Sequence, residues 1–489
     1  MAKKKQMQVK FVEEEKKTSG EKQFPIKIGL EIHGYLDTNE KLFCMCKTSS
    51  DGSNLDGEDE RPNTRICPIC TGNPGSKPML PNKNAFDKLI KIALVLGCKI
   101  NSSKELIWQR KHYDWADLPK GYQNTISGAH STPPAYDGKF HSIRITECHL
   151  EEDPAQWNPE TGKVNYNRSG LPLIEIVTEP DFSDSEQVIE WLKYLIHSLS
   201  YIKTIRKNAG IKVDVNVSTY GDRAEIKNLN SLDKIKRAIE YEVSRQLENH
   251  EKGIVQKRET LAYDERLGKT IKMRDKEGQA DYRFIPDPDL PVLLIGEKDV
   301  NKIKREIPEM PEEKLDKLLK KYKVDKNNAE ILAKNLELVE FFEELANQLG
   351  EKQVVESLSW ITIELLRILN YNKKTLDDEE IDIQPKHLAE LIKLVTSGKI
   401  TPLKAKQVMN DFIPKSFSIK EKGDISVINN DAVENICRQV ISENQHVVDE
   451  YKSGKEQSLN WLIGQVMKLS ERRADFKAAK DCLLKLIKI

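Results

Sequence analysis

The chain has 489 residues, of which 38% are hydrophobic and 32% are charged, a balance typical of several domains with apolar cores beneath charged surfaces. Lysine plus arginine and aspartate plus glutamate each number 78, so the formal net charge is zero. This excludes a chain uniformly coated in positive charge and leaves room for a local basic patch. The sequence has no apolar run of about 18 residues or more, which excludes a membrane-spanning helix.

The first predicted feature in chain order is a polar tail over residues 1–23. It lacks the apolar core of a secretory signal, and it holds too many glutamates for an organellar transit peptide. We therefore expect a disordered, solvated tail on a cytoplasmic protein.

A strand is predicted next, in the segment IKIGLEIHG. Side chains alternate along a strand, so Ile28, Leu30 and Ile32 face one side. Glu31 and His33 then lie next to each other on the opposite side. If the apolar side packs on a core, this pair could line a cavity on the opposite side.

Four of the eight cysteines follow within a short stretch, as a C-x-C pair and a C-x-x-C pair. They are Cys44, Cys46, Cys67 and Cys70. Without an export signal, clustered cysteines favour metal binding over disulfides. Four thiolates from two tight turns suit tetrahedral Zn²⁺, and such a closed site leaves no position for water, so its role would be structural. The alternative is two unrelated pairs of reduced thiols.

Two further segments, TECHLEEDP (146–154) and LPLIEIVTEPD (171–181), place carboxylates in predicted strands. The acids and the imidazole are Glu147, His149, Glu151, Glu152, Asp153, Glu175 and Glu179. A carboxylate inside an apolar run, such as Glu175, is costly to bury without a partner. Together with Glu31 and His33 these groups predict a Mg²⁺ site, because Mg²⁺ prefers oxygen ligands and binds through a few carboxylates plus phosphates. The alternative is that each acid pairs with a nearby base such as Arg144 or Arg168.

Several nucleotide and hydrolase motifs are absent from the sequence. No P-loop and no G-x-S-x-G elbow occurs, and the CPIC and EIH segments do not match zinc deaminases. Four turn-rich loops instead mix Gly or Pro with basic, amide and aromatic residues, as expected of loops that hold a charged ligand. They are 117–123, 165–173, 224–231 and 280–291.

The proline-rich segment 286–291 predicts a domain boundary. Strand-like runs dominate before it, with helices predicted over 85–96 and 185–201, and helical spacing dominates after it. We expect an α+β domain over residues 24–295, a helical domain over 296–410 and a small all-helical tail domain over 411–489. From Tyr451 onward the chain has nine Lys or Arg and four Asp or Glu, a local excess of +5 that could bind nucleic-acid phosphates or simply be a solvated helix face.

Taken in order, several of these segments closely resemble the B subunits (GatB) of the tRNA-dependent Asp/Glu amidotransferases. The matching segments are GLEIH, KLFCMC, CPICTGNPGS, DLPKGYQ, HLEED, NYNRSGLPLIEIVTEPD, EIKNLNS and DYRFIPDPDLP. The chain then runs directly into helices, whereas the related E subunits carry a large inserted domain. The resemblance extends to the tail segment YKSGKEQSLNWLIGQVMK.

The resemblance implies a cradle-shaped catalytic domain followed by a helical domain and a tRNA-binding tail domain. It implies that ATP and Mg²⁺ phosphorylate the side-chain carboxylate of a mischarged Glu-tRNA(Gln) or Asp-tRNA(Asn). Ammonia then displaces the phosphate and leaves the amide. An amidase partner, the glutaminase of the complex, would supply the ammonia through a channel, and a small belt-like partner would join the two in a heterotrimer.

The resemblance also assigns site residues by their place in the motifs. Glu31, His33, Glu152 and Glu175 match the catalytic Mg²⁺ ligands, with Glu151 and Glu179 as second choices. Lys120, Asn167 and Arg168 are weaker candidates for contacts to ATP or the aminoacyl end. The four cysteines match a zinc knuckle that some members have.

The chain departs from the family at Trp115-Ala116, where an aromatic-Pro pair is usual, at Asn165, where Asp is usual, and in the tail segment ERRADF, which lacks the usual Gly and Pro. The four proposed ligands are unaffected. Two other hypotheses are a non-catalytic, zinc-stapled tRNA-binding scaffold and a glutaminase, the second of which is disfavoured by the absence of an amidase pattern. The sequence leaves open which of the two tRNAs is the substrate.

Overall fold

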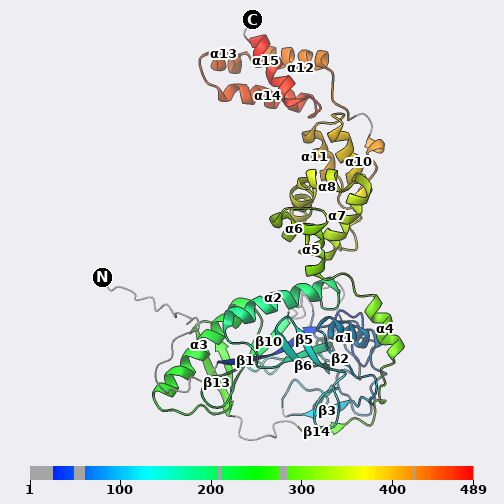
Figure 1. The fold of residues 1–489 in the computed structure, drawn as a ribbon, viewed down its shortest axis with the longest axis vertical. Coiled ribbons are helices and arrows are strands. Elements are labelled where there is room, and N and C mark those ends of the chain that lie inside the picture. The colour runs from blue at the N-terminus through cyan, green and yellow to red at the C-terminus, as the bar shows by residue number, and fades with distance from the viewer. Residues whose placement is uncertain are drawn as a thin grey trace. The chain divides into compact units, whose positions relative to one another are not determined.

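The computed structural model describes residues 26–48, 61–113, 115–206, 211–275, 283–422 and 425–487 (Figure 1). The predicted tail over residues 1–23 lies outside these ranges. The chain divides into two compact units, residues 1–307 and 308–489.

The first unit is built on one large mixed sheet. Its strands are β1 (Lys27–Tyr35), β2 (Lys99–Ile100), β3 (Gln109–His112), β4 (Tyr122–Thr125), β5 (Ala135–Phe140), β6 (Ile143–Glu152), β9 (Pro172–Thr178), β10 (Ile211–Ser218), β11 (Ala224–Leu229), β12 (Glu259–Asp264), β13 (Lys269–Asp275) and β14 (Arg283–Pro286). The main path runs β13-β12-β11-β10-β1-β9-β6-β4-β3-β14, with β5 joining β2 to β6. A separate hairpin pairs β7 (Gln156–Trp157) with β8 (Val164–Asn165). β11 pairs in parallel with β12, and the other paired strands are antiparallel.

Four helices accompany this sheet: α1 (Lys83–Val95), α2 (Ser185–Tyr201), α3 (Leu232–Glu251) and α4 (Glu297–Arg305). Helices α2 and α3 pack on each other beside the central strands β1 and β10 (Figure 1). Helix α2 has the predicted bounds because its first turn is capped, with the Asp184 side chain accepting a hydrogen bond from the backbone N–H of Gln187.

The predicted alternation of β1 is confirmed. Ile28, Leu30 and Ile32 are buried, whereas Glu31 and His33 are partly exposed. In the neighbouring strand β10 the three valines are fully buried; between them, Asn216 is partly exposed and Asp214 is buried. The central strands therefore have one apolar core face and one polar face, and the polar face carries the candidate site.

The second unit is entirely helical in the residues described. Its helices are α5 (Pro311–Lys320), α6 (Lys326–Leu332), α7 (Leu336–Leu349), α8 (Glu351–Glu356), the π-helical turn η1 (Trp360–Leu365), α9 (Leu366–Tyr371), α10 (Pro385–Thr396), α11 (Pro402–Asn410), the 3₁₀ turn η2 (Ile419–Lys422), α12 (Asn430–Glu443), α13 (Gln445–Lys452), α14 (Gln457–Leu469) and α15 (Phe476–Ile487). They form two hydrophobic cores, one within residues 318–419 and one within 433–487. The α+β class followed by helices is thus as predicted.

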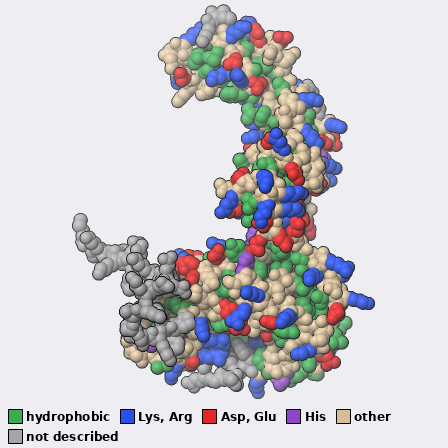
Figure 2. Space-filling view, viewed as in Figure 1, with side chains coloured by type: hydrophobic (Ala, Val, Ile, Leu, Met, Phe, Trp, Pro, Cys, Tyr) green, Lys and Arg blue, Asp and Glu red, His purple; other side chains and the backbone are tan. Residues whose placement is uncertain are grey.

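Side chains of both charge signs are interspersed over the visible face of each unit (Figure 2), consistent with the zero formal net charge. Among the described residues, no helix has the length and apolar character needed to cross a bilayer.

Candidate functional site

Three residues from adjacent strands form a row across the polar face of the sheet. The register pairs His33 of β1 with Glu175 of β9, and Glu175 in turn with His149 of β6. The Nε2 atoms of His33 and His149 lie 3.3 Å and 3.4 Å from the same oxygen, Oε2 of Glu175. One carboxylate is therefore clamped between two imidazoles.

This row shifts the pKa of each of its members. Burial alone would lower the pKa of His33, but the hydrogen bond and charge of Glu175 raise it to about 9. Burial also opposes the charge of His149, yet Glu175 and Glu147 raise its pKa to about 10. Although burial disfavours the Glu175 carboxylate, the two histidines hold its pKa well below its usual range. The raised pKa values of the two histidines and the lowered pKa of Glu175 favour an imidazolium–carboxylate–imidazolium row.

A second cluster lies on the neighbouring strands and contains only carboxylates. Glu31 of β1 faces Asp214 of β10, and Glu225 comes from β11. Their ligand oxygens all lie within 4.8 Å of one another. Lys227 forms ion pairs with Asp214 and Glu225. Burial raises the pKa of Glu31, and the Lys227 charge opposes that rise.

The residues of the second cluster fit a hard cation. Three carboxylates at this spacing offer the oxygen ligands that Mg²⁺ prefers. Asn216 donates a hydrogen bond to Oε1 of Glu31 at 3.3 Å. Its own Oδ1 is buried and has no hydrogen-bond partner within the described part of the chain. A buried acceptor without a donor beside a carboxylate cluster is a position that a cation or its water would satisfy.

At the end of β6, two adjacent glutamates form ion pairs with different lysines. Glu151 accepts hydrogen bonds from Lys111 at 3.1 Å and from Gln123 at 3.2 Å. A Glu151 oxygen also lies within 4.8 Å of the ligand atoms of His149 and Glu175. Glu152 forms its ion pair with Lys120.

The four predicted Mg²⁺ ligands thus fall on one polar face but not in one tight group. Glu175 is in contact with His33. Glu31 groups with Asp214 and Glu225. Glu152 pairs with Lys120. The assignment of these four as ligands stays a prediction.

The weaker candidates make contacts within the protein. The Glu179 carboxylate accepts from Thr146 Oγ1 at 2.9 Å. Arg168 pairs with Asp153 at 3.0 Å, and Arg144 pairs with Asp181. The groups that face the predicted ligands Glu175 and Glu152 are instead two histidines and a lysine.

Asn167 has a clear structural position. Its Oδ1 accepts hydrogen bonds from the backbone N–H groups of Thr64 and Arg65 at 2.9 and 3.0 Å. Its Nδ2 donates to the Arg61 carbonyl at 3.1 Å. These bonds fasten the segment that leads into Cys67. A role for Asn167 in substrate contact stays a prediction.

Sequence reasoning did not single out Asp214, although a usable signal was present. It placed Glu225 in a predicted ligand-holding loop over 224–231, which was wrong for residues 224–229, because they form strand β11. In IKVDVNVS the three valines alternate with Asp214 and Asn216. This is the same pattern that singled out Glu31, and it places the polar residues on one face. What the pattern could not supply is the pairing of β10 with β1.

The four clustered cysteines come together as predicted, with their Sγ atoms within 4.8 Å of one another. The Sγ atoms of Cys67 and Cys70 are 3.9 Å apart. A Zn–S bond of about 2.3 Å requires sulfurs at roughly this separation in a tetrahedron, so the donor set fits the metal. The hydrogen bond from Cys44 and the charge of Lys41 help to lower the pKa of Cys70 to about 4.

Lys41 is 1% exposed and lies against this cluster. Its ammonium donates to Cys70 Sγ at 3.5 Å, to the Arg65 carbonyl at 2.9 Å and to the Tyr166 carbonyl at 3.2 Å. A buried lysine is found where negative charge compensates it, and four thiolates around Zn²⁺ carry such charge.

Comparison with known proteins gives consistent matches along the chain. A family model described as "GatB/GatE catalytic domain" matches residues 26–301, and one described as "GatB domain" matches residues 340–487. The B subunit of the aspartyl/glutamyl-tRNA(Asn/Gln) amidotransferase of Methanocaldococcus jannaschii is 41% identical over 472 residues, covering 94% of this chain and 97% of that protein. The protein of the same name from Methanopyrus kandleri is 41% identical over 456 residues, covering 92% and 96%. One from Methanococcus maripaludis is 39% identical over 476 residues, covering 94% and 98%.

Proposed function

The chain belongs to the family of aspartyl/glutamyl-tRNA amidotransferase B subunits, and from this premise we propose the reaction that its polar sheet face carries out. The family members are ligases that form C–N bonds. The substrate proposed here is a tRNA carrying Glu in place of Gln, or Asp in place of Asn. The product is the correctly amidated aminoacyl-tRNA.

The proposed reaction has two steps, phosphorylation of the carboxylate and amidation of the acyl phosphate. A side-chain carboxylate oxygen of the tRNA-bound amino acid attacks the γ-phosphorus of ATP, the bond to the β-phosphate oxygen breaks, and ADP leaves. Ammonia then attacks the carbonyl carbon of the acyl phosphate, inorganic phosphate leaves, and the nitrogen loses a proton to give the amide. The first step requires positioning and charge neutralisation more than covalent help from the protein.

The observation that carries this proposal is the concentration of acids and imidazoles on one sheet face. The His33–Glu175–His149 row lies beside the Glu31–Asp214–Glu225 cluster. Both are attached to a sheet whose other face is a packed core. A rigid support of this kind holds reacting groups in fixed positions, which is the main contribution a protein makes to phosphoryl transfer.

Mg²⁺, when bound, would neutralise the phosphate charge of ATP. We propose that Glu31, His33, Glu152 and Glu175 hold it, with Glu151, Asp214 and Glu225 as the adjacent acids. His33 must give up its proton before its ring nitrogen can bind a cation, so cation binding would release a proton. Lys120, now paired with Glu152, would be free to contact phosphate oxygens once a cation takes that carboxylate.

The reaction also requires a source of ammonia, protection from water and a means of binding tRNA. An acyl phosphate hydrolyses readily, so water must be kept from the site while ammonia enters. We propose that an amidase partner with glutaminase activity supplies the ammonia and that a small belt-like partner completes a heterotrimer. Zn²⁺ at the four cysteines would stabilise the segment near the site, and residues 411–489 would bind tRNA. The reaction would take place in the cytoplasm, where charged tRNAs are used.

The test is an amidation assay with the chain co-expressed with the amidase and the small belt-like partner. ATP, Mg²⁺, an ammonium salt and tRNA carrying labelled Glu or Asp are supplied, and the released amino acid is identified. Labelled Gln or Asn is expected with the wild type and is expected to be lost in Glu175→Gln. Glu190→Gln is the matched control, because Glu190 is exposed on α2.

The two labelled tRNAs also decide the substrate, which the sequence leaves open. Amide from one tRNA alone assigns that substrate, and amide from both assigns a dual role. If tRNA binds tightly but no amide forms, the result would contradict the proposed reaction. It would support the alternative that the chain is a non-catalytic tRNA-binding scaffold.

A further inference from the structure

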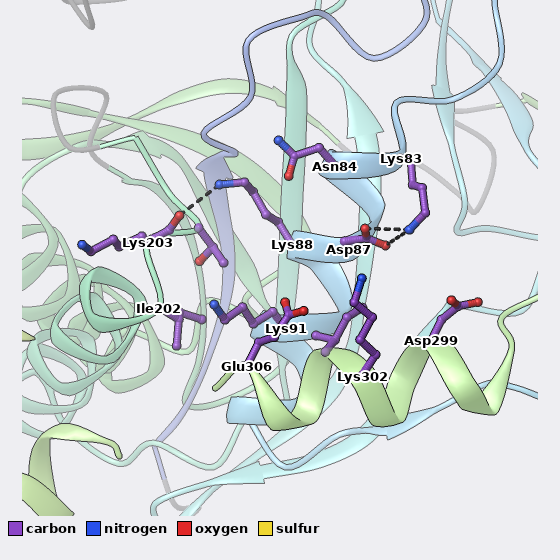
Figure 3. Close-up of a pocket in the computed structure, with 12 residues that line it drawn as sticks. Lys83, Asn84, Asp87, Lys88, Lys91, Ile202, Lys203, Asp299, Lys302 and Glu306 are labelled. Atoms are coloured by element: carbon purple, nitrogen blue, oxygen red, sulfur yellow. Dashed lines mark hydrogen bonds and ion pairs between the residues drawn. The ribbon is translucent and has the colours of Figure 1, made fainter. Parts of the chain in front are cut away.

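A cavity of about 380 Å³ in the first unit shares no lining residue with the candidate site (Figure 3). Helix α1 lines it with Lys83, Asp87 and Lys91, spaced four residues apart and therefore on one helix face. Helix α4 lines it with Asp299, Lys302 and Ile303, followed by Glu306 just after the helix, and the chain after α2 adds Ile202, Lys203 and Thr204. Two helix faces and a turn thus surround a polar space.

Positive charge exceeds negative charge in this cavity. The lining has five lysines against three acids, a difference of +2. Asp87 forms an ion pair with Lys83 at 2.7 Å. Figure 3 shows this pair at one end of the cavity, apart from Lys88 and Lys91.

Lys88 is held in place by a backbone carbonyl and by an ion pair with a carboxylate from outside the cavity. Its side chain is only 17% exposed, its Nζ donates to the Lys203 carbonyl at 3.0 Å, and the Asp37 carboxylate is 3.9 Å away. Burial lowers the pKa of Lys88; the charge of Asp37 opposes that effect, and the charges of Lys91 and Arg206 add to it. The ammonium group has donors left for a ligand.

Lys91 and Lys302 form no hydrogen bond or ion pair within the described residues. Burial lowers the pKa of Lys91, while the charge of Glu306 opposes that effect and the charge of Lys203 adds to it. Lys302 extends from α4 toward the same space (Figure 3). Ammonium groups crowded without partners favour the entry of an anion.

Helix α4 has little apolar anchoring of its own. Ile303 is its one buried residue in the described chain, and the rest of its cavity-facing side is charged. An anion between α1 and α4 would replace repulsion between their lysines by attraction to both. It would therefore fasten α4 to the body of the first unit.

The lining also indicates the class of anion. It contains no aromatic side chain, and its apolar members are Ile202 and Ile303, so it offers no platform for a nucleobase to stack on. Lysine ammonium groups bind phosphate as point charges. We propose that this cavity binds a phosphate group, either as free phosphate or as a phosphodiester of an RNA chain.

The test measures hydrogen exchange of the α4 amides in the full-length chain. Inorganic phosphate is titrated at constant ionic strength, with chloride making up the difference, and unacylated tRNA is titrated in a second series. Phosphate is expected to slow exchange in residues 297–305. The apparent affinity should fall about tenfold in Lys91→Gln and in Lys302→Gln, the size of one charge-assisted hydrogen bond.

Lys298→Gln is the matched control, since Lys298 is exposed on the same helix and does not line the cavity. It should leave the protection unchanged. Because Lys302 is itself exposed, its variant keeps the test valid even if Lys91→Gln does not fold.

The two series separate the sources of the phosphate. Protection by free phosphate that is lost in the Lys91 and Lys302 variants supports a free-anion site. Protection by tRNA alone with the same variant dependence supports a phosphodiester. No protection in either series, equal protection by chloride, or equal effects of Lys302→Gln and Lys298→Gln would overturn the proposal. No amidation activity is required, so failure of the proposed reaction is a separate result.

Discussion

At the scale of single residues, the polar sheet face depends on charges that compensate one another across strands. Glu175 is ionised because two imidazoles face it, which keeps its pKa low. Glu31 is not held between imidazoles in this way, and burial raises its pKa. Neighbouring carboxylates with different environments are suited to different tasks, such as binding a cation and accepting a proton.

A prediction at this scale concerns Lys41, the buried lysine at the cysteine cluster. Lys41→Met removes the donor to Cys70 Sγ and to two backbone carbonyls. We expect the affinity for Zn²⁺ to fall by about 10- to 100-fold, as is common when a group that bonds to a metal ligand is removed. The measurement is competition with a chromogenic chelator.

Lys41→Arg keeps the charge and is expected to recover part of that affinity. The control is Lys47→Met, because Lys47 is exposed in the same segment. Equal zinc affinity in the wild type and Lys41→Met would contradict the role given to Lys41.

At the scale of elements, strand alternation was sufficient to predict the faces of β1, and the local pattern was sufficient to predict the bounds of α2. Alternation was not sufficient for β6. The register of β6 against β9 shifts between Ile145 and Glu147, and such a bulge changes which face later residues occupy. Before it, the odd-numbered Ile145 is buried. After it, the even-numbered Cys148 and Leu150 are the hydrophobic core residues.

The same bulge explains why the strand pattern alone does not separate Glu151 from Glu152, so that the choice of Glu152 depends on the family resemblance. After the shift, Glu147, His149 and Glu151 alternate onto the polar face, which places Glu151 beside His149 and Glu175. Glu152 comes at the strand end and meets Lys120. A bulge depends on the pairing of distant strands, and a local sequence pattern does not contain that information. The pairing that brings Asp214 to Glu31 is equally nonlocal.

A prediction at the element scale concerns helix α7. Phe342 is fully buried in the first core of the second unit, where it packs edge-on against Tyr322. Phe342→Ala is expected to destabilise this unit by about 3–5 kcal/mol, through lost transfer free energy and the cavity left behind. Denaturant unfolding monitored by hydrogen exchange in each unit is the measurement.

Phe476→Ala is the control, since Phe476 is 51% exposed on α15 and should change stability by about 0.5 kcal/mol or less. The first unit should be unaffected by either substitution. Loss of protection in the sheet strands of Phe342→Ala would contradict the division into two units.

At the scale of the whole molecule, a neutral chain must still bind a polyanion if the proposed substrate is correct. The basic excess from Tyr451 to the end of the chain is one source of attraction. The last core, within residues 433–487, is separate from the preceding one, to which Phe412 and Ile419 still belong. A deletion that begins after these two residues therefore keeps all the buried residues of the earlier core.

A prediction at this scale follows from that separation. Deleting residues 428–489 is expected to weaken tRNA binding and to reduce its salt dependence, because fewer phosphates are neutralised. The fold of the preceding residues should be retained. Filter binding over a range of salt concentrations measures the first effect, and circular dichroism with thermal unfolding checks the second. Unchanged tRNA affinity would refute a role for the C-terminal tail domain in tRNA binding.

The central claim is that the acid and imidazole cluster on the polar face phosphorylates the carboxylate of a tRNA-bound amino acid. The most direct measurement is ADP formation by the assembled enzyme with Mg²⁺ and ATP, without glutamine or ammonium. We predict ADP formation that requires tRNA charged with Glu or Asp, is absent with uncharged tRNA, and is lost in Glu175→Gln but not in Glu190→Gln. Equal ADP formation by Glu175→Gln and wild type, or none with any charged tRNA, would contradict that claim.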